Sequence, residues 1–139
     1  MTVFADSNEV EKYIGKMFEV VVVDPDFVAA TKGSGLVLRL NYSDPDCVML
    51  IDFPGQKVQY GKAAEAAANV TVDLYMASDD AHAFWLGNLN FPVAMARRKV
   101  RMEGSMAKAL KLLPLTKPLF AAYKKELRAT GRTDLLEKG

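Results

Sequence analysis

Histidine, cysteine and tryptophan each occur only once in the 139 residues, as His82, Cys47 and Trp85. A single histidine cannot build a multi-histidine metal site, and with scattered serines it gives no catalytic triad. A lone cysteine forms no internal disulfide, and its apolar neighbours predict an inert, buried thiol. Neither G-x-S-x-G nor a phosphate-cradling glycine motif occurs. The sequence therefore disfavours an enzyme and predicts no metal and no cofactor.

Long hydrophobic runs are also missing, since no apolar stretch approaches the roughly 20 residues of a membrane span. The segment Met1–Asp6 lacks a basic region followed by an apolar core, so we expect no secretory signal. Hydrophobic residues make up 50% and charged residues 25% of the chain, as in ordinary globular proteins. We expect a cytoplasmic protein with a single domain over residues 1–131 and a loose polar tail over 132–139.

Charge is unevenly distributed, although the formal net charge is only +1. Residues 1–96 hold 6 Lys and Arg against 13 Asp and Glu, whereas residues 97–139 hold 12 against 4. The two parts could simply attract each other within one fold. Alternatively, the basic part could transiently face an anionic membrane, where each cation contributes on the order of 1 kcal/mol. Nucleic acid is not an expected partner, because no basic stripe is interleaved with exposed aromatics.

Hydrophobic periodicity predicts helices at both ends of the chain and five strands between them. Alternating apolar residues predict strands near 36–42, 46–53, 56–60, 70–76 and 99–103. Short connections make the first three strands an antiparallel meander. An apolar stripe at helical spacing follows Ser7, which can cap this helix, and Ser78 and Ser105 are expected to cap two further helices. Other helices are expected to begin at Phe91 and near Thr116 or Lys117. His82, one turn into its helix, is expected at the surface.

The segment from Phe84 to Leu115 carries more apolar surface than so short a stretch needs to hold itself together. It includes Phe84 beside Trp85 and three methionines, Met95, Met102 and Met106. Methionine suits irregular apolar sites because its side chain is flexible and polarizable. Ordinary core filling is the simpler alternative for these side chains. We expect this segment to cover the sheet and an apolar ligand to bind between the segment and the sheet.

Residues 70–115 resemble the sterol carrier protein 2 family, the small sterol-binding and lipid-transfer domains. The matching motifs are Val70-Thr71-Val72-Asp73-Leu74, the helix start Ser78 to Asp80, the stretch Phe84 to Leu89, the strand Lys99 to Gly104, and Ala109-Leu110-Lys111-Leu112. The N-terminal helix and the strand pair at 36–53 also fit. Two positions depart from the family pattern: Arg98 stands where glycine is frequent, and Ser105 stands where aspartate is usual.

The resemblance implies an α+β fold with a five-stranded, mostly antiparallel sheet, covered by helices around a hydrophobic tunnel for sterols, fatty acids or fatty acyl chains. Residues matching the tunnel-lining segments are Phe84, Trp85, Leu89, Phe91, Met95, Met102, Met106, Leu110 and Leu113, and one end would be closed by Leu119, Phe120 and Tyr123. The implied function is lipid binding and transfer, by a monomer or homodimer. The alternative is a non-catalytic interaction or dimerisation module whose apolar surface is buried by a partner.

Overall fold

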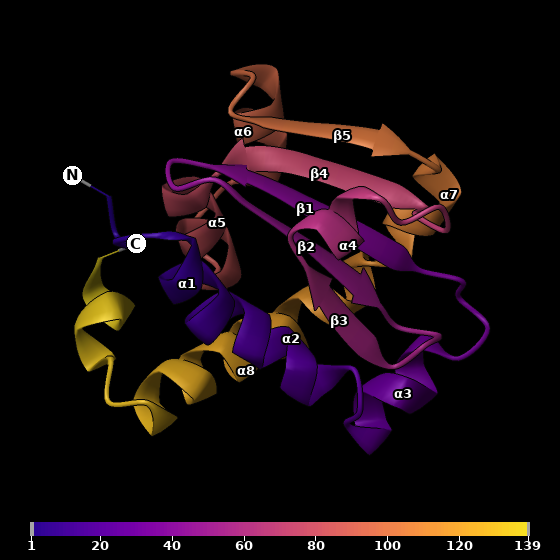
Figure 1. The fold of residues 1–139 in the computed structure, drawn as a ribbon, viewed down its shortest axis with the longest axis horizontal. Helices are drawn as coiled ribbons and strands as arrows, with labels where there is room; N and C mark the ends of the chain where they lie inside the picture. Colours follow the sequence, from indigo (N-terminus) through magenta and orange to yellow (C-terminus); the bar gives the residue numbers. More distant parts are fainter. Residues whose placement is uncertain (1, 139) are drawn as a thin grey trace.

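The computed structural model describes residues 2–138, in which five strands form one sheet in the order β3-β2-β1-β4-β5 (Figure 1). Neighbouring strands are antiparallel, except that β1 and β4 are parallel. The expected α+β class and mostly antiparallel sheet are confirmed, and each strand boundary lies within two residues of its predicted place. The strands are β1 (Val37–Ser43), β2 (Cys47–Asp52), β3 (Lys57–Tyr60), β4 (Val72–Ala77) and β5 (Val100–Gly104).

Most helices lie on one side of the sheet, and the short helix α4 (Lys62–Glu65) lies on the other. The N-terminal helix is continuous through α1 (Ser7–Val10), a π-helical turn η1 (Glu11–Gly15) and α2 (Lys16–Val21). The remaining helices are α3 (Pro25–Thr31), α5 (Ser78–Trp85), α6 (Phe91–Ala96), α7 (Met106–Leu110), η2 (Leu113–Leu115), α8 (Thr116–Ala129) and η3 (Thr133–Glu137).

Strand alternation gives the sheet two different faces. Leu38, Leu40 and Tyr42 of β1 point with Leu74 and Met76 of β4 toward the helices, and all five are buried. The residues between them point to the opposite face, which α4 and the residues that follow it, Ala67 and Val70, partly cover. The main core therefore lies between one face of the sheet and the N-terminal helix, α5 and α8, as the hydrophobic alternation predicts.

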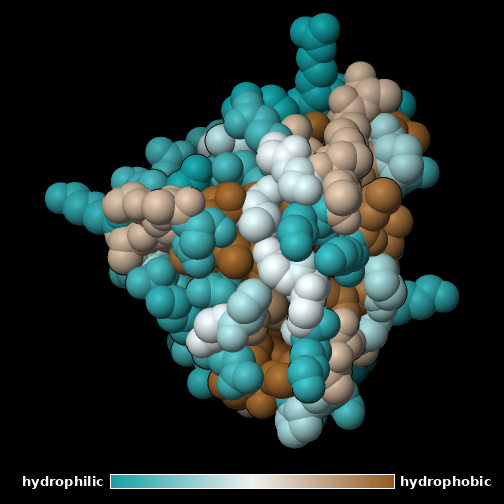
Figure 2. Space-filling view, turned by 90° about the vertical axis from the view of Figure 1, so that its right-hand side faces the viewer, coloured by the Kyte–Doolittle hydropathy of each residue, from teal (hydrophilic) through white to brown (hydrophobic). Residues whose placement is uncertain are grey.

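The surface mixes apolar and polar side chains. On the side of the molecule that carries α3 and α7, apolar side chains form separate patches between hydrophilic ones (Figure 2). None of the helices within residues 2–138 combines the length and hydrophobicity that a membrane crossing demands.

Two helices begin differently from the sequence prediction. Asp6, rather than Ser7, caps α1, because Asp6 has extended backbone and its carboxylate accepts a hydrogen bond from a first-turn N–H at 3.0 Å. Ala77 occupies the cap position of α5, so Ser78 already lies in the first turn. The Ser78 hydroxyl instead donates to the Pro45 carbonyl at 2.8 Å. Ser78 thus ties the helix start to the β1–β2 turn.

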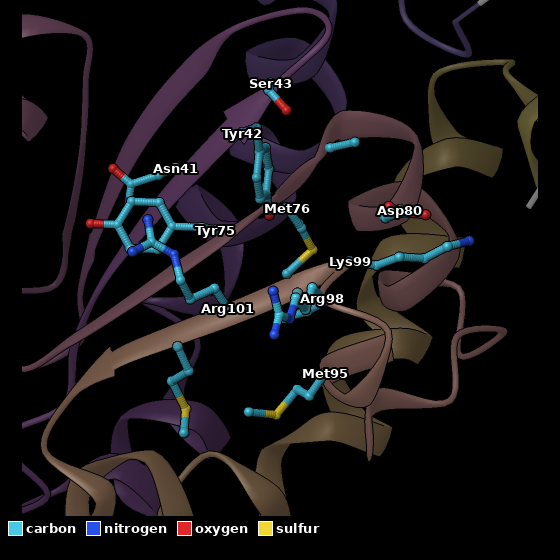
Figure 3. Close-up of a pocket in the computed structure, with 13 residues that line it drawn as sticks. Asn41, Tyr42, Ser43, Tyr75, Met76, Asp80, Met95, Arg98, Lys99 and Arg101 are labelled. Atoms are coloured by element: carbon cyan, nitrogen blue, oxygen red, sulfur yellow. The ribbon is translucent and has the colours of Figure 1, made fainter. Parts of the chain in front are cut away.

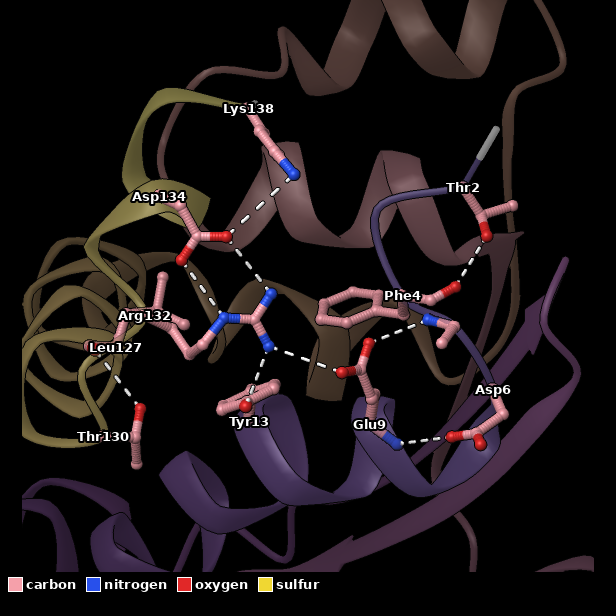
Figure 4. Close-up of polar contacts among 11 residues, drawn as sticks. Thr2, Phe4, Asp6, Glu9, Tyr13, Leu127, Thr130, Arg132, Asp134 and Lys138 are labelled. Carbon is pink, nitrogen blue, oxygen red and sulfur yellow. Dashed lines mark hydrogen bonds and ion pairs between the residues drawn. The ribbon is translucent and has the colours of Figure 1, made fainter.

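The C-terminal segment packs against the core, so the prediction of a loose polar tail over 132–139 is wrong for the described residues. Leu135 is fully buried. The Arg132 guanidinium donates to the Tyr13 hydroxyl at 2.9 Å and lies 3.4 Å from the Glu9 carboxylate (Figure 4). Leu135, the partly buried Leu136 and Arg132 therefore hold a segment whose other residues are mostly polar. The last residue lies outside the described part of the chain.

His82 is fully buried beneath that segment, which corrects its expected surface position. Its Nε2 lies 2.8 Å from the Leu135 carbonyl oxygen, and this nitrogen carries the proton because a carbonyl can only accept. Nδ1 then accepts a hydrogen bond from the Tyr123 hydroxyl at 2.7 Å. Burial lowers the pKa of His82, and the hydrogen bond to Leu135 opposes this effect only in part. His82 is thus a neutral link between α5, α8 and the C-terminal segment.

We predict that the free energy of unfolding decreases as the pH falls below about 6.5, the ordinary pKa of histidine. In that range the unfolded chain binds a proton that buried His82 does not, so acid favours unfolding. Denaturant titrations at about pH 7.5 and about pH 5.5 measure the difference. His82→Gln keeps a side-chain N–H without titrating and should lose most of this pH dependence. The same pH dependence in both proteins would contradict the assignment.

Gly104 ends β5 in a conformation that a larger residue cannot adopt. Its φ is +107°, and an added Cβ would lie 2.4 Å from the Thr71 carbonyl oxygen. We predict that Gly104→Ala lowers the free energy of unfolding by about 3 kcal/mol, because backbone strain and a clash act together. Gly33→Ala is the matched control, since φ there is +74° with no atom within 4 Å. It should cost only about 1–2 kcal/mol, and equal losses would refute the role of the clash.

Candidate functional site

An apolar cavity of about 300 Å³ lies between β4, β5 and the helices that follow them. Thr116 supplies the only hydroxyl in its lining, and no ionisable side chain lines it among the described residues. Half of the residues predicted to contact a ligand line this cavity: Phe84, Leu89, Phe91, Met102, Leu113 and Phe120. The cavity stands where the tunnel was expected, and a continuous tunnel stays a prediction.

An aromatic cluster forms one wall of the cavity. The Phe84 ring lies 5.4 Å from the Phe91 ring and 5.8 Å from the Phe120 ring, measured between centroids. Gly87 ends α5 with φ +85°, and a Cβ there would lie 3.1 Å from the Phe120 ring. Glycine at this position therefore turns the chain and lets α8 approach α5 closely.

Sequence reasoning found Met102 but missed the part of the wall that β4 and the inner side of α7 contribute. Leu74 of β4 pairs with Met102 of β5, so both side chains point to the helix-covered face and line the cavity. Ala109 and Leu112 close it from the side of α7. The alternation of β4 contained the signal for Leu74, because it assigned this residue to the same face as the rest of the core.

Three predicted residues belong to the core instead of the cavity lining. Trp85, Leu119 and Tyr123 are all fully buried. The Trp85 indole N–H donates to the hydroxyl of Tyr42 of β1 at 2.9 Å. The Trp85 ring lies 4.6 Å from the Phe84 ring. Trp85 is thus one side chain away from the cavity and can report on its occupancy.

The other three predicted residues lie at the surface. Met106 and Leu110 are 61% and 56% exposed on the outer side of α7, and Met95 is 37% exposed on α6. Leu113 is 63% exposed although it lines the cavity, which places it at the rim. A helix as short as α7, in which Lys108 is the one polar residue, does not reveal from its spacing which side faces inward. In the structure, the side of α7 that carries Ala109 faces the cavity.

A second and larger cavity, of about 850 Å³, opens beside the ends of β1 and β4 and the start of β5 (Figure 3). Arg98, Lys99 and Arg101 line it together with methionines, and Met102 lines both cavities. The Arg101 guanidinium lies 4.0 Å from the centre of the Tyr75 ring. This cavity therefore combines apolar side chains with basic groups, whereas the first has no ionisable group among the described residues of its lining.

His82 and Cys47 line neither of the two cavities. Cys47 is buried in the core, as predicted, and burial raises the pKa of its thiol to about 12. Within residues 2–138, no three His, Cys, Asp or Glu side chains are grouped so that they could hold a metal ion. The apolar cavity offers mainly hydrocarbon surface, so what it can do is take apolar surface out of water.

Comparison with solved structures finds the same fold in sterol carrier protein domains. The sterol carrier protein domain 2 of Helicoverpa armigera has a TM-score of 0.64 at 19% identity, covering 87% of this chain and 95% of that chain. Sterol carrier protein 2 from Yarrowia lipolytica, in its apo form, has a TM-score of 0.59 at 13% identity, covering 91% of this chain and 98% of that chain. The palmitated SCP2L2 from Aedes aegypti has a TM-score of 0.54 at 24% identity, covering 77% of this chain and 93% of that chain.

No curated protein sequence matches the chain. Residues 24–117, more than half of the chain, match the profile of the SCP-2 sterol transfer family. The matched residues contain all five strands and the helices α5, α6 and α7 that border the apolar cavity. The chain belongs to the SCP-2 sterol transfer family.

Proposed function

We propose that the protein binds a lipid in the apolar cavity and transfers it between membranes without catalysing a reaction. The cavity itself carries this proposal, since its lining consists of hydrocarbon side chains with a single hydroxyl. Burying a ligand there contributes about 25 cal/mol per Å² of apolar area. Membership of a sterol transfer family supports the same class of ligand.

The size and lining of the cavity favour weak selectivity among lipids. At about 300 Å³ it lies at the small end of protein ligand sites, so longer ligands require the rim to move. Leu113 at the rim is largely exposed and lies in a short 3-10 turn, which a small displacement can open. The Aedes aegypti neighbour, described as palmitated, supports an acyl chain as one suitable ligand.

A membrane-facing surface surrounds the rim of the cavity. Among the described residues, five of the seven exposed large hydrophobic side chains belong to α6, α7 and η2: Val93, Met95, Met106, Leu110 and Leu113. Lys108, Lys111 and Lys117 lie in the same part of the chain. Apolar side chains beside lysines suit the surface of an anionic membrane. A lipid could then enter the cavity from the membrane without crossing water.

Ala109→Phe should abolish lipid binding, because the added ring would occupy the cavity that Ala109 lines. We expect the affinity for a polyene fatty acid to fall about tenfold or more. Energy transfer from Trp85 to the bound probe measures this. Ala107→Phe is the control, because Ala107 lies on the same helix but is exposed and outside the lining. Unchanged binding by Ala109→Phe would contradict the assignment of the cavity.

Leu110→Asp should weaken binding to vesicles that contain phosphatidylserine by roughly tenfold, since it removes buried apolar area and adds negative charge. Vesicle sedimentation measures the bound fraction, and added salt should reduce it for the unmodified protein. Val23→Asp is the control, because Val23 is 58% exposed, similar to Leu110, but follows α2. Equal effects of the two substitutions would exclude this surface as the membrane contact.

A dimerisation module is the second candidate, favoured by the same exposed side chains of α7. Two copies that buried Met106 and Leu110 against each other would also remove this surface from water. Analytical ultracentrifugation separates the two functions. A dimer that Leu110→Asp dissociates, in a protein that binds no lipid probe, would favour the module over the carrier.

A further inference from the structure

Arg98 occupies a backbone position that ordinarily belongs to glycine. Its φ is +61°, and it ends α6 in the two-bond pattern that closes many helices. The Lys99 N–H bonds to the Ala94 carbonyl at 2.9 Å, and the Arg98 N–H bonds to the Met95 carbonyl at 3.0 Å. A side chain at this left-handed position is unfavourable because Cβ crowds the backbone. The arginine side chain therefore calls for an explanation beyond the turn itself.

The Arg98 side chain lines the larger cavity, between Met76 and Met95 (Figure 3). Arg101, in the same lining, forms an ion pair with Glu103 at 2.6 Å. Neither Arg98 nor Lys99 forms an ion pair within the described residues. Asp80 is the only carboxylate in the lining, against three cations. The cavity therefore presents a net positive charge beside methionine side chains.

Met102 connects this basic cavity to the apolar one. Its side chain lines both, on the face of β5 that pairs with Leu74. A methionine thioether is flexible enough to let a slender chain pass. The two cavities thus form adjacent apolar and cationic sites on either side of one adaptable residue.

We propose that the ligand is a single-chain lipid with an anionic head group, whose chain fills the apolar cavity and whose head lies beside Arg98. This inference rests on the proposed lipid binding and adds the chemistry of the head group. A guanidinium pairs with a carboxylate or a phosphate through two parallel hydrogen bonds, and Lys99 adds a second cation. A neutral head group would leave this charge without a partner.

The test compares lipids that share one chain and differ in the head group. Oleate, oleoyl lysophosphatidate and methyl oleate compete with a fluorescent polyene methyl ester for the protein in solution. We expect oleate or the lysophosphatidate to compete roughly tenfold better than methyl oleate. A stronger effect of one anion identifies carboxylate or phosphate as the preferred head.

Arg98→Gln should remove that advantage while leaving the affinity for methyl oleate unchanged. Arg98→Gly should do the same and keep or raise the thermal midpoint, because glycine suits the left-handed backbone. Arg97→Gln is the control: this neighbouring arginine does not line the cavity, and its loss should leave the preference intact.

Three results would overturn the inference. Equal competition by the acid and its methyl ester would exclude an anionic head-group site while leaving lipid binding in place. Equal effects of Arg97→Gln and Arg98→Gln would attribute the preference to overall charge. Failure of every probe, including the neutral ester, to bind the unmodified protein would refute the proposed function and this inference together.

Discussion

The parallel pairing of β1 with β4 is the constraint on which the site depends. Parallel neighbours need a crossover connection, so the chain leaves β3, passes over the far face through α4 and enters β4 beside β1. It then returns as β5, the edge strand, next to β4 alone. The short helices α6 and α7 border this edge, and Phe84 of α5 and Phe120 of α8 complete the wall. The cavity therefore lies between the edge of the sheet and these helices.

Local signals were sufficient for the strands and for most helix starts, because alternation and capping act within a few residues. Ser105 illustrates this, because its hydroxyl accepts a hydrogen bond from the Lys108 N–H at 3.2 Å and so caps α7. An aspartate, which is usual at this position, could cap the helix in the same way. The errors arose from distant contacts. His82 is buried and bonds the carbonyl of Leu135, which lies 53 residues further along the chain. The buried Leu135 side chain also holds the C-terminal segment against the core. A segment this short and polar has no hydrophobic periodicity from which these contacts could be predicted.

The candidate site could be predicted by segment but only partly by residue. Phe84 and Met102 were identified because they match the tunnel-lining segments of the family, and both line the cavity. Leu110 was placed in the cavity and Ala109 was not, although the structure reverses them. The orientation of a five-residue helix depends on what it packs against. The left-handed backbone of Arg98 had one signal in the sequence, because glycine is frequent at this position in the family pattern.

An unfilled cavity also has an energetic cost that connects stability with binding. The cavity is open at its rim, where Leu113 is 63% exposed. Water that enters it finds a single hydroxyl in the lining, so the hydrocarbon area in contact with that water costs about 25 cal/mol per Å². Occupancy by an apolar chain, or collapse of α6 and α7 onto the edge of the sheet, removes that cost. The place for a ligand therefore follows from an edge strand that is bordered by short helices.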